Sequence, residues 1–137
     1  MPSVKGVLET ALYVEDLERA AKFYSLILKF EKLLSTEKYC ALSVAGRQIL
    51  MLFKKGASLQ PAVVTGGAIP ATDGQGNLHL AFAIGMSEVE EWESWLHLNG
   101  VTIESKVNWK RGGHSLYFRD PDRNCIELIT PGCWSIY

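Results

Sequence analysis

The chain has 137 residues, of which 47% are hydrophobic and 21% charged, and its formal net charge is −1. This composition describes one globular domain, residues 1–137, and leaves no room for a second large one. The charge balance excludes the basic surface that attracts nucleic acid or anionic lipid, so a small molecule is the expected partner. No apolar run reaches the length of a membrane span, and residues 1–5 do not resemble a signal peptide, so we expect a cytoplasmic protein.

The three cysteines, Cys40, Cys125 and Cys133, are odd in number and include no CxxC pair. We therefore expect reduced thiols that behave as small hydrophobic residues. A disulfide framework or a structural zinc site is not indicated.

The first half of the chain reads as a strand, a helix and three strands. A strand is predicted over residues 7–14, and Asp16 then stands at an N-cap position. The following helix places Leu17, Ala20, Ala21, Tyr24 and Leu28 on one face, which should cover a sheet. Three strands are predicted over residues 30–36, 38–44 and 48–53.

The second half repeats this order. A strand over residues 78–84 precedes residues 87–90, which read as a capping box that opens a helix with its apolar face at Val89, Trp92, Trp95 and Leu96. Gly100 is expected to end that helix. Strands follow over residues 102–107, 115–119 and 125–130, joined by turns. The chain is therefore an internal duplication: module one spans about residues 4–54, module two about 78–131, and a tail 132–137.

Residues 55–77 connect the modules. This stretch is rich in glycine and proline and shows no sustained periodicity, so we predict a linker. Two interpretations are open: a plain connection, or a lid or binding loop over a site.

Three polar residues interrupt apolar strands. Glu127 stands between Ile126 and Leu128, Glu9 stands between Leu8 and Thr10 in the first strand, and His79 lies between two leucines. Because side chains alternate along a strand, each points away from its apolar neighbours. Glu9 and His79 also hold the same place in their modules, on the strand before the helix. The polar faces are expected to line a cavity.

Two carboxylates and one imidazole form a plausible site for a divalent metal ion. Mn²⁺, Fe²⁺, Co²⁺, Ni²⁺, Zn²⁺ and Mg²⁺ all remain open, because ligand types alone do not select among them. The alternative is a metal-free pocket in which Glu9 and Glu127 pair with arginines such as Arg111 or Arg119.

Residues 108–114 form a predicted hairpin tip with further candidates for a substrate pocket. Arg111 or His114 would bind a carboxylate or phosphate, and Trp109 would form an apolar wall, although exposed turn chemistry explains the same residues. Tyr13 and Tyr117 are pocket candidates as well, with core packing as the more common use of such tyrosines.

The chain resembles the vicinal oxygen chelate superfamily, which contains glyoxalase I, extradiol dioxygenases, fosfomycin-resistance enzymes and bleomycin-resistance proteins. The resemblance covers nearly the whole chain and rests on residues 12–17 with Phe23 and Tyr24, residues 79–82, and residues 117–121 with Asn124, Glu127 and Leu128. It implies an α+β fold of two tandem βαβββ modules whose mixed sheets curl around a cavity. It also implies a divalent metal held at positions matched by Glu9, His79 and Glu127.

The chain departs from these relatives at three positions. Met51 is a further pocket candidate. The resemblance to glyoxalase I implies a second acidic ligand, equivalent to Glu127, at this position. The methionine therefore weakens the prediction of a glyoxalase-type proton shuttle. The resemblance to extradiol dioxygenases implies a metal site of two histidines and one carboxylate, and Glu9 stands where one of the two histidines would be. Lys29 stands where many relatives have glycine at the end of the first helix.

Two classes of function follow from the resemblance. The presence of Glu9, His79 and Glu127 at matching module positions favours a metal-dependent enzyme. In such an enzyme the ion acts as a Lewis acid on a substrate that binds through two oxygen atoms. We expect lyase or isomerase chemistry first, ring-cleaving oxygenation second and group transfer third. A metal-free binding protein of the bleomycin-resistance type is the alternative. The apolar tail, residues 132–137, favours a homodimer.

Overall fold

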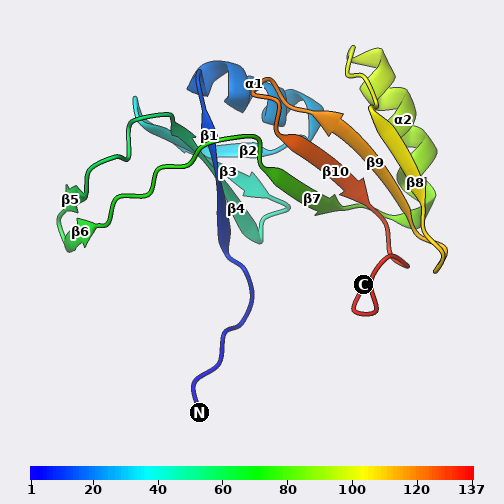
Figure 1. Ribbon diagram of the computed structural model, residues 1–137, viewed down its shortest axis with the longest axis horizontal. Coiled ribbons are helices and arrows are strands. Elements are labelled where there is room, and N and C mark those ends of the chain that lie inside the picture. Colours follow the sequence, from blue (N-terminus) through cyan, green and yellow to red (C-terminus); the bar gives the residue numbers. More distant parts are fainter. The chain divides into compact units, whose positions relative to one another are not determined.

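The structure, a computed structural model, describes residues 1–137 and divides into two compact units, Met1–Gly76 and Asn77–Tyr137. Each unit contains a mixed four-stranded sheet and one α-helix (Figure 1). The strand order is β1-β4-β3-β2 in the first unit and β7-β10-β9-β8 in the second, so the two sheets have the same topology. The predicted α+β fold and its internal duplication are confirmed.

The first unit follows the predicted order of a strand, a helix and three strands. Its elements are β1 (Glu9–Val14), α1 (Leu17–Ile27), β2 (Glu31–Ser35), β3 (Tyr39–Val44) and β4 (Gln48–Lys54). β1 pairs with β4 in parallel, whereas β3 pairs with β2 and β4 in antiparallel fashion. A parallel pair needs a crossover connection, and α1 with the strands after it supplies one.

Local sequence signals explain where α1 begins and ends. Asp16 is extended and accepts a hydrogen bond from the backbone N–H of Arg19 at 2.9 Å, as an N-cap residue does. Ala20, Tyr24 and Ile27 are buried, so the predicted apolar face does cover the sheet. Beyond the C-cap, Lys29 has a φ of 59°, a left-handed conformation that glycine adopts at less cost.

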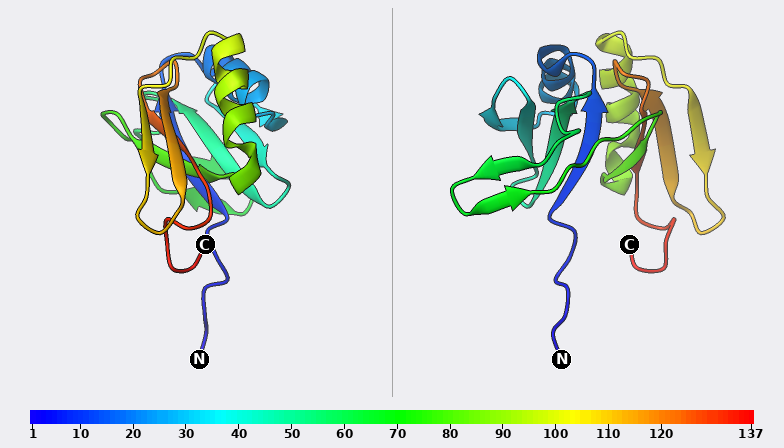
Figure 2. Two further views of the ribbon diagram at one scale, coloured as in Figure 1. Left: turned by 90° about the vertical axis from the view of Figure 1, so that its right-hand side faces the viewer. Right: turned by 60° about the vertical axis from the view of Figure 1, so that its left-hand side comes forward.

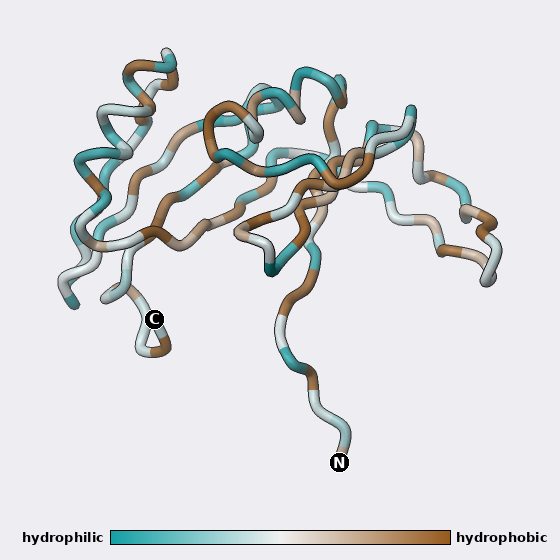
Figure 3. The backbone as a smooth tube through the Cα atoms, turned by 180° about the vertical axis from the view of Figure 1, so that it is seen from behind, coloured by the Kyte–Doolittle hydropathy of each residue, from teal (hydrophilic) through white to brown (hydrophobic).

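The linker between the sheets contains more structure than its composition suggests. A small antiparallel hairpin forms from β5 (Ala62–Val64) and β6 (Gly67–Ile69). Val63 in this hairpin is 88% exposed, and the hairpin includes hydrophobic stretches (Figure 3). The sequence analysis did not identify this hairpin, because three-residue strands are too short to give a periodic pattern.

The second unit repeats the topology of the first. Its elements are β7 (His79–Ala83), the 3₁₀ turn η1 (Met86–Glu88), α2 (Val89–Leu98), β8 (Ser105–Asn108), β9 (His114–Arg119) and β10 (Cys125–Ile129). β7 pairs in parallel with β10, and β10 pairs with β9 in antiparallel fashion. The predicted third-to-last strand began too early, since residues 102–104 lie outside β8.

The start of the second helix differs from the prediction. Glu88, rather than Glu90, closes the turn: its carboxylate accepts the backbone N–H of Gly85, and its own N–H donates to the Gly85 carbonyl. Ser87 lies inside η1 and caps nothing. The helix end is as predicted, because Gly100 has a φ of +70° just beyond Asn99.

The two faces of the second sheet have different character. Leu116 and Phe118 of β9, and Ile126 and Leu128 of β10, are buried, as is Leu96 of α2. Burial of each such side chain contributes roughly 1.5–3 kcal/mol. Figure 2 shows α2 along one side of this sheet. The alternate residues of β9 and β10 therefore leave the opposite face, where the candidate site lies.

Neither α-helix has the length of a membrane span. α1 has 11 residues and α2 has 10, and no helix of the chain is long and apolar enough to cross a bilayer. A transmembrane helix needs about 20 residues. The three cysteines are free thiols, and Cys40 is buried.

Candidate metal centre

The turn before β10 fixes the two strands that carry the site. One carboxylate oxygen of Asp120 accepts the backbone N–H groups of Asp122 and Asn124, at 2.9 and 2.8 Å. The side chain of Asn124 then accepts the N–H of Leu78 at 2.9 Å, next to His79. This buried network ties the start of β7 to the start of β10 and so sets His79 against β10.

Glu127 is a buried carboxylate with two polar neighbours. Its side chain is 7% exposed. Oε1 accepts a hydrogen bond from the hydroxyl of Tyr117 at 2.8 Å, and Oε2 lies 3.2 Å from Nε2 of His79. Burial of an ionised carboxylate is unfavourable unless partners replace the lost water, and these two side chains are those partners.

His79 is held so that one ring nitrogen faces Glu127. Its Nδ1 lies 2.9 Å from the carbonyl oxygen of Cys125, and the ring stacks on Tyr117 with 6.3 Å between centroids. A carbonyl oxygen only accepts hydrogen bonds, so Nδ1 must carry the proton. The other nitrogen, Nε2, is then the one presented to the carboxylate.

This arrangement favours a proton or a cation between Nε2 of His79 and Oε2 of Glu127. With Nδ1 protonated, Nε2 of neutral His79 presents a lone pair to a carboxylate oxygen, and the two repel each other. A second proton on the ring or a divalent metal ion bound by both atoms removes the repulsion. In metal sites, a ligating imidazole commonly donates its other ring N–H to an acceptor, and a ligating carboxylate commonly accepts a hydrogen bond on its other oxygen. Nδ1 of His79 and Oε1 of Glu127 make contacts of this kind. The residues therefore fit a metal.

Tyr117 acts as a hydrogen-bond donor in this site. Burial, the hydrogen bond to Glu127 and the negative charge of Glu127 together raise the pKa of the Tyr117 phenol from 10.0 to about 12. The phenol therefore stays protonated near neutral pH and holds one oxygen of Glu127. It is not a base under these conditions.

The first unit contains the equivalent positions but not the equivalent side chains. Glu9 pairs with Ile49, and His79 pairs with Cys125. Two residues further along the partner strands, Met51 is therefore the counterpart of Glu127. Across the sheet from these two, Ala41 is the counterpart of Tyr117. Glu9 is exposed on β1. No group of three or more His, Cys, Asp or Glu side chains that could hold a metal lies within either unit. The second unit thus brings together His79 and Glu127 of the predicted ligands, and Glu9 belongs to the first.

A pocket of about 340 Å³ adjoins the pair. His79, Glu127 and Tyr117 form its polar side. The remaining lining side chains are Trp109, Ile129, Cys133 and Trp134. Of the predicted pocket residues in this unit, Trp109 and Tyr117 line this pocket.

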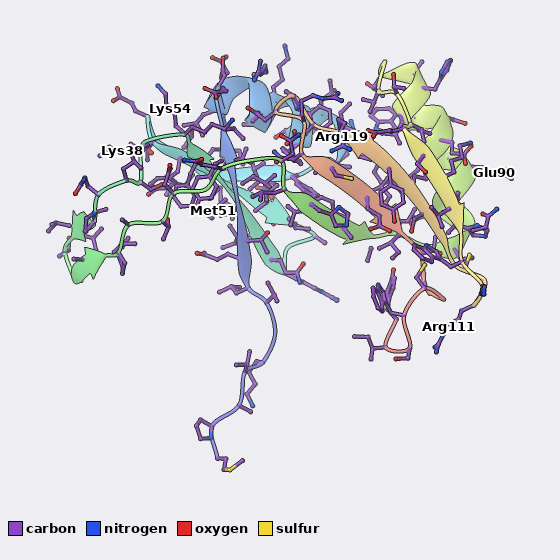
Figure 4. All side chains as sticks on the ribbon, in the orientation of Figure 1. Lys38, Met51, Lys54, Glu90, Arg111 and Arg119 are labelled. Atoms are coloured by element: carbon purple, nitrogen blue, oxygen red, sulfur yellow. The ribbon has the colours of Figure 1, made fainter.

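The cationic candidates lie elsewhere. Arg111 is exposed at the tip of the β8–β9 hairpin, and Arg119 is at the other end of β9 (Figure 4). Arg119 is bound to both carboxylate oxygens of Glu104, at 2.7 and 3.1 Å. Glu127 is thus bound by Tyr117 and His79, so the arginine partner considered for a metal-free pocket is not found for this carboxylate.

His114 and Tyr13 also occupy other surroundings. His114 hydrogen-bonds Asn108 and lines a separate pocket of about 500 Å³ beside α2. Tyr13, in the first unit, stacks on Phe53 with 5.8 Å between ring centroids. Gly74 of the linker approaches this ring so closely that an added Cβ would lie 2.5 Å from it. Tyr13 is therefore partly covered by the linker.

Sequence reasoning missed three residues of the pocket. Ile129 follows Glu127 by two positions on β10, and strand alternation alone would have found it. Cys133 and Trp134 belong to the tail, whose path depends on contacts with the β8–β9 hairpin rather than on any periodic pattern. Those contacts had no signal in the sequence.

Two units of one helix and four mixed strands, with an imidazole and a carboxylate paired on an open sheet face, define the glyoxalase fold class. The family model described as "Glyoxalase/Bleomycin resistance protein/Dioxygenase superfamily" matches residues 6–128. The chain belongs to this superfamily, as its resemblance to vicinal oxygen chelate proteins implied.

Individual relatives span several activities. The chain is 30% identical to metallothiol transferase FosB of Staphylococcus saprophyticus, over 93% of this chain and 78% of that protein. It is 29% identical to catechol-2,3-dioxygenase of Bacillus subtilis, over 87% of this chain but 39% of that protein. The crystal structure of lactoylglutathione lyase from Agrobacterium tumefaciens matches with a TM-score of 0.88 and 29% identity, over 98% of this chain and 99% of that one.

Proposed function

We propose that this protein is a metal-dependent enzyme acting on a small molecule, with a divalent ion bound by His79 and Glu127 of the second unit. The observation that carries the proposal is the pairing of His79 Nε2 with Glu127 Oε2 at 3.2 Å, each fixed from behind by a second hydrogen bond. Glu9 occupies in its module the place that His79 occupies in the other, and the family resemblance implies it as a further ligand.

The charge of this ligand set suits a divalent ion. Glu9 and Glu127 together supply two negative charges, and neutral His79 supplies none, so the occupied site has no net charge. The name of the FosB relative, a metallothiol transferase, supports a metal-dependent reaction. Three protein ligands also leave coordination positions for a substrate. This fits a substrate that presents two neighbouring oxygen atoms.

The residues around the ion would have distinct roles. A bound divalent ion would supply Lewis acidity to a substrate oxygen. The hydroxyl of Tyr117 keeps Glu127 oriented, and the carbonyl of Cys125 keeps Nε2 of His79 free of its proton. Trp109 and Ile129 contribute apolar lining to the pocket beside the pair.

The reaction type is left open by the fold. The relatives are named as a transferase, a dioxygenase and a lyase, and one fold supports all of these chemistries. Met51 at the counterpart of Glu127 argues against a second acidic ligand of the glyoxalase type. Glu9 gives a ligand set with two carboxylates, unlike the two-histidine set that oxygen-activating iron sites use.

The proposal is tested by elemental analysis of protein purified without an affinity tag or chelator. We expect about one divalent metal ion per chain. A Glu127→Ala variant should lose the ion, because its removal takes away a ligand, and a Glu9→Ala, His79→Ala double variant should lose it as well. Circular dichroism would establish that the variants remain folded.

His97→Ala is the matched control, since His97 is an exposed histidine of α2, away from the sheet face that carries the pair. Its metal content should equal that of the wild type. If the wild type holds no ion after reconstitution with several divalent metals, the metal assignment is wrong and the alternative of a metal-free binding protein stands.

We also propose a homodimer. Trp134 and Ile136 in the tail are 68% and 94% exposed, and every residue of the edge strand β2 is exposed, including Leu33 and Leu34. Exposed apolar side chains beside an unpaired strand edge favour association between copies of a chain.

A further inference from the structure

The pocket beside His79 and Glu127 has an unusual wall for a site that would bind a charged molecule. Apart from the pair, its lining consists of two indoles, a phenol, an isoleucine and a thiol. No lysine or arginine is among the lining residues. The character of this wall bears on which substrates the enzyme takes.

Trp109 is held rigidly in this wall. Its indole N–H donates a hydrogen bond to the hydroxyl of Ser115 at 2.8 Å, and Ser115 is 1% exposed. The backbone N–H of Trp109 also donates to the carbonyl of Gly113 across the hairpin. Trp109 nevertheless remains 40% exposed. A fixed, partly exposed indole is a preorganised surface on which a flat ring can stack.

Trp134 is brought to the same pocket by the tail. Gly113 lies so close to the tail that an added Cβ would come within 2.8 Å of the backbone nitrogen of Cys133. Further along, the hydroxyl of Tyr137 donates to the carbonyl of Ile84 at 3.0 Å. These contacts hold the tail at both ends and thereby position Trp134 in the pocket wall.

The basic side chains of β8, β9 and the hairpin between them do not line this pocket. Arg111 is exposed at the hairpin tip, and Arg119 is held by Glu104. Lys106 is bound to Glu93 at 2.6 Å. An anionic group in the pocket would therefore meet the carboxylate of Glu127 without a compensating side chain.

We infer that the substrate is an uncharged molecule with an aromatic ring, which stacks against Trp109 and Trp134 while its oxygen atoms face the metal pair. This rests on the proposed function for the position of the oxygens, but the ring subsite stands on the second unit alone. The same wall disfavours phosphonates, phosphates and carboxylates as substrates.

The ring subsite is tested first on metal-free protein, so that metal binding plays no part. Phenol and methylphosphonate would each be titrated while ligand-observed NMR follows binding. We expect phenol to bind and methylphosphonate not to bind. Trp109→Ala and Trp134→Ala should each weaken phenol binding about threefold to tenfold, the effect of removing one aromatic contact.

Two variants serve as controls. Ile136→Ala alters an exposed apolar residue of the same tail that does not line the pocket and should leave phenol binding unchanged. Trp109→Phe keeps a ring and should retain most of the affinity that Trp109→Ala loses. Retention in Trp109→Phe would separate ring stacking from a general loss of folded structure.

The second arm uses metal-loaded protein with catechol and ethane-1,2-diol, which share two neighbouring oxygens but differ in the ring. We expect catechol to bind at least tenfold more tightly, with the metal content unchanged after titration. Equal binding of the two diols, binding of methylphosphonate, or tryptophan variants with wild-type affinity would overturn the inference and leave the metal site standing. A protein that binds phenol but no metal would overturn the proposed function and leave the ring subsite.

Discussion

Lys29 shows how one residue can depart from its relatives at a cost to stability. Its φ of 59° lies in the left-handed region, where a Cβ is unfavourable by roughly 1–2 kcal/mol. The family resemblance implies glycine at this position, and the backbone conformation supplies a physical reason for it. The departure was visible in the sequence, whereas its conformational cause was visible only in the structure.

Lys29→Gly is therefore expected to stabilise the protein by about 1 kcal/mol, because glycine adopts this conformation without strain. Urea denaturation would measure the change in the free energy of unfolding. Lys22→Gly is the control: Lys22 lies inside α1, where glycine is unfavourable and should destabilise the protein. A destabilised Lys29→Gly variant would contradict the argument.

Tyr117 makes stability depend on pH in the alkaline range. Its phenol titrates at about 12 in the folded protein, against 10.0 as the ordinary value. A folded-state pKa above the unfolded value stabilises the fold fully below about pH 10, and this contribution is lost as the pH rises toward 12. The hydrogen bond to Glu127 is one source of this raised pKa.

The corresponding variant is Tyr117→Phe, which cannot ionise. We expect the wild type to be more stable than Tyr117→Phe at pH 8, and the difference to shrink by pH 11. Urea midpoints at both pH values measure it, and Tyr39→Phe in the other unit controls for loss of a tyrosine hydroxyl in general. A stability difference that is the same at both pH values would show that ionisation of Tyr117 is not coupled to folding.

At the scale of elements, the contact between the β8–β9 hairpin and the tail is the most sensitive to substitution. An added Cβ on Gly113 would lie 2.5 Å from the sulfur of Cys133 and 2.9 Å from the carbonyl carbon of Gly132. Both distances are too short for nonbonded carbon and sulfur atoms, and one involves backbone that cannot rotate away.

We expect Gly113→Ala to detach the tail from the hairpin and expose Cys133. Burial raises the pKa of the Cys133 thiol, so its reactivity in the wild type is suppressed. Labelling with a thiol reagent, followed by peptide mapping, should show faster modification of Cys133 in the variant. Gly66→Ala is the control, because a Cβ there meets nothing within 4 Å; an unchanged rate at Cys133 in Gly113→Ala would refute the expected displacement.

The elements with strong local signals were predicted from the sequence, and the others were not. Asp16 and Gly100 marked one helix start and one helix end because each satisfies backbone groups or conformations locally. The predicted capping box at Ser87 was wrong, because the carboxylate of Glu88 accepts the backbone N–H of Gly85 and residues 86–88 form a 3₁₀ turn instead. The β5–β6 hairpin lacked enough residues to give a pattern.

At the scale of the whole molecule, the duplication made part of the site predictable. Equivalence of the modules drew attention to Glu9 and His79, and strand alternation drew attention to Glu127, and the structure does pair the last two at 3.2 Å. The role of Tyr117 as the donor to Glu127 depends on the pairing of β9 with β10 and was not predicted. The position of the tail depends on tertiary contacts with the β8–β9 hairpin and could not be predicted from the sequence.

Association between copies is the prediction that belongs to this scale. We expect light scattering at micromolar concentration to give twice the chain mass of 15.2 kDa. The exposed apolar side chains of β2 and the tail would then be covered by a second copy. Leu34→Lys on β2 should weaken the dimer, and Lys32→Ala on the same strand should weaken it less. A single species at the chain mass for the wild type would rule out the dimer.

The unequal sheets give this protein an internal comparison for its own chemistry. Ala41 and Met51 occupy on one sheet the positions that Tyr117 and Glu127 occupy on the other. Two copies of one topology that differ in these side chains separate what the backbone contributes to the site from what the side chains contribute. Positions 41 and 51 of the first sheet are therefore where the donors of the second sheet could be introduced by substitution, whereas Glu9 on β1 would have to be kept as an expected ligand.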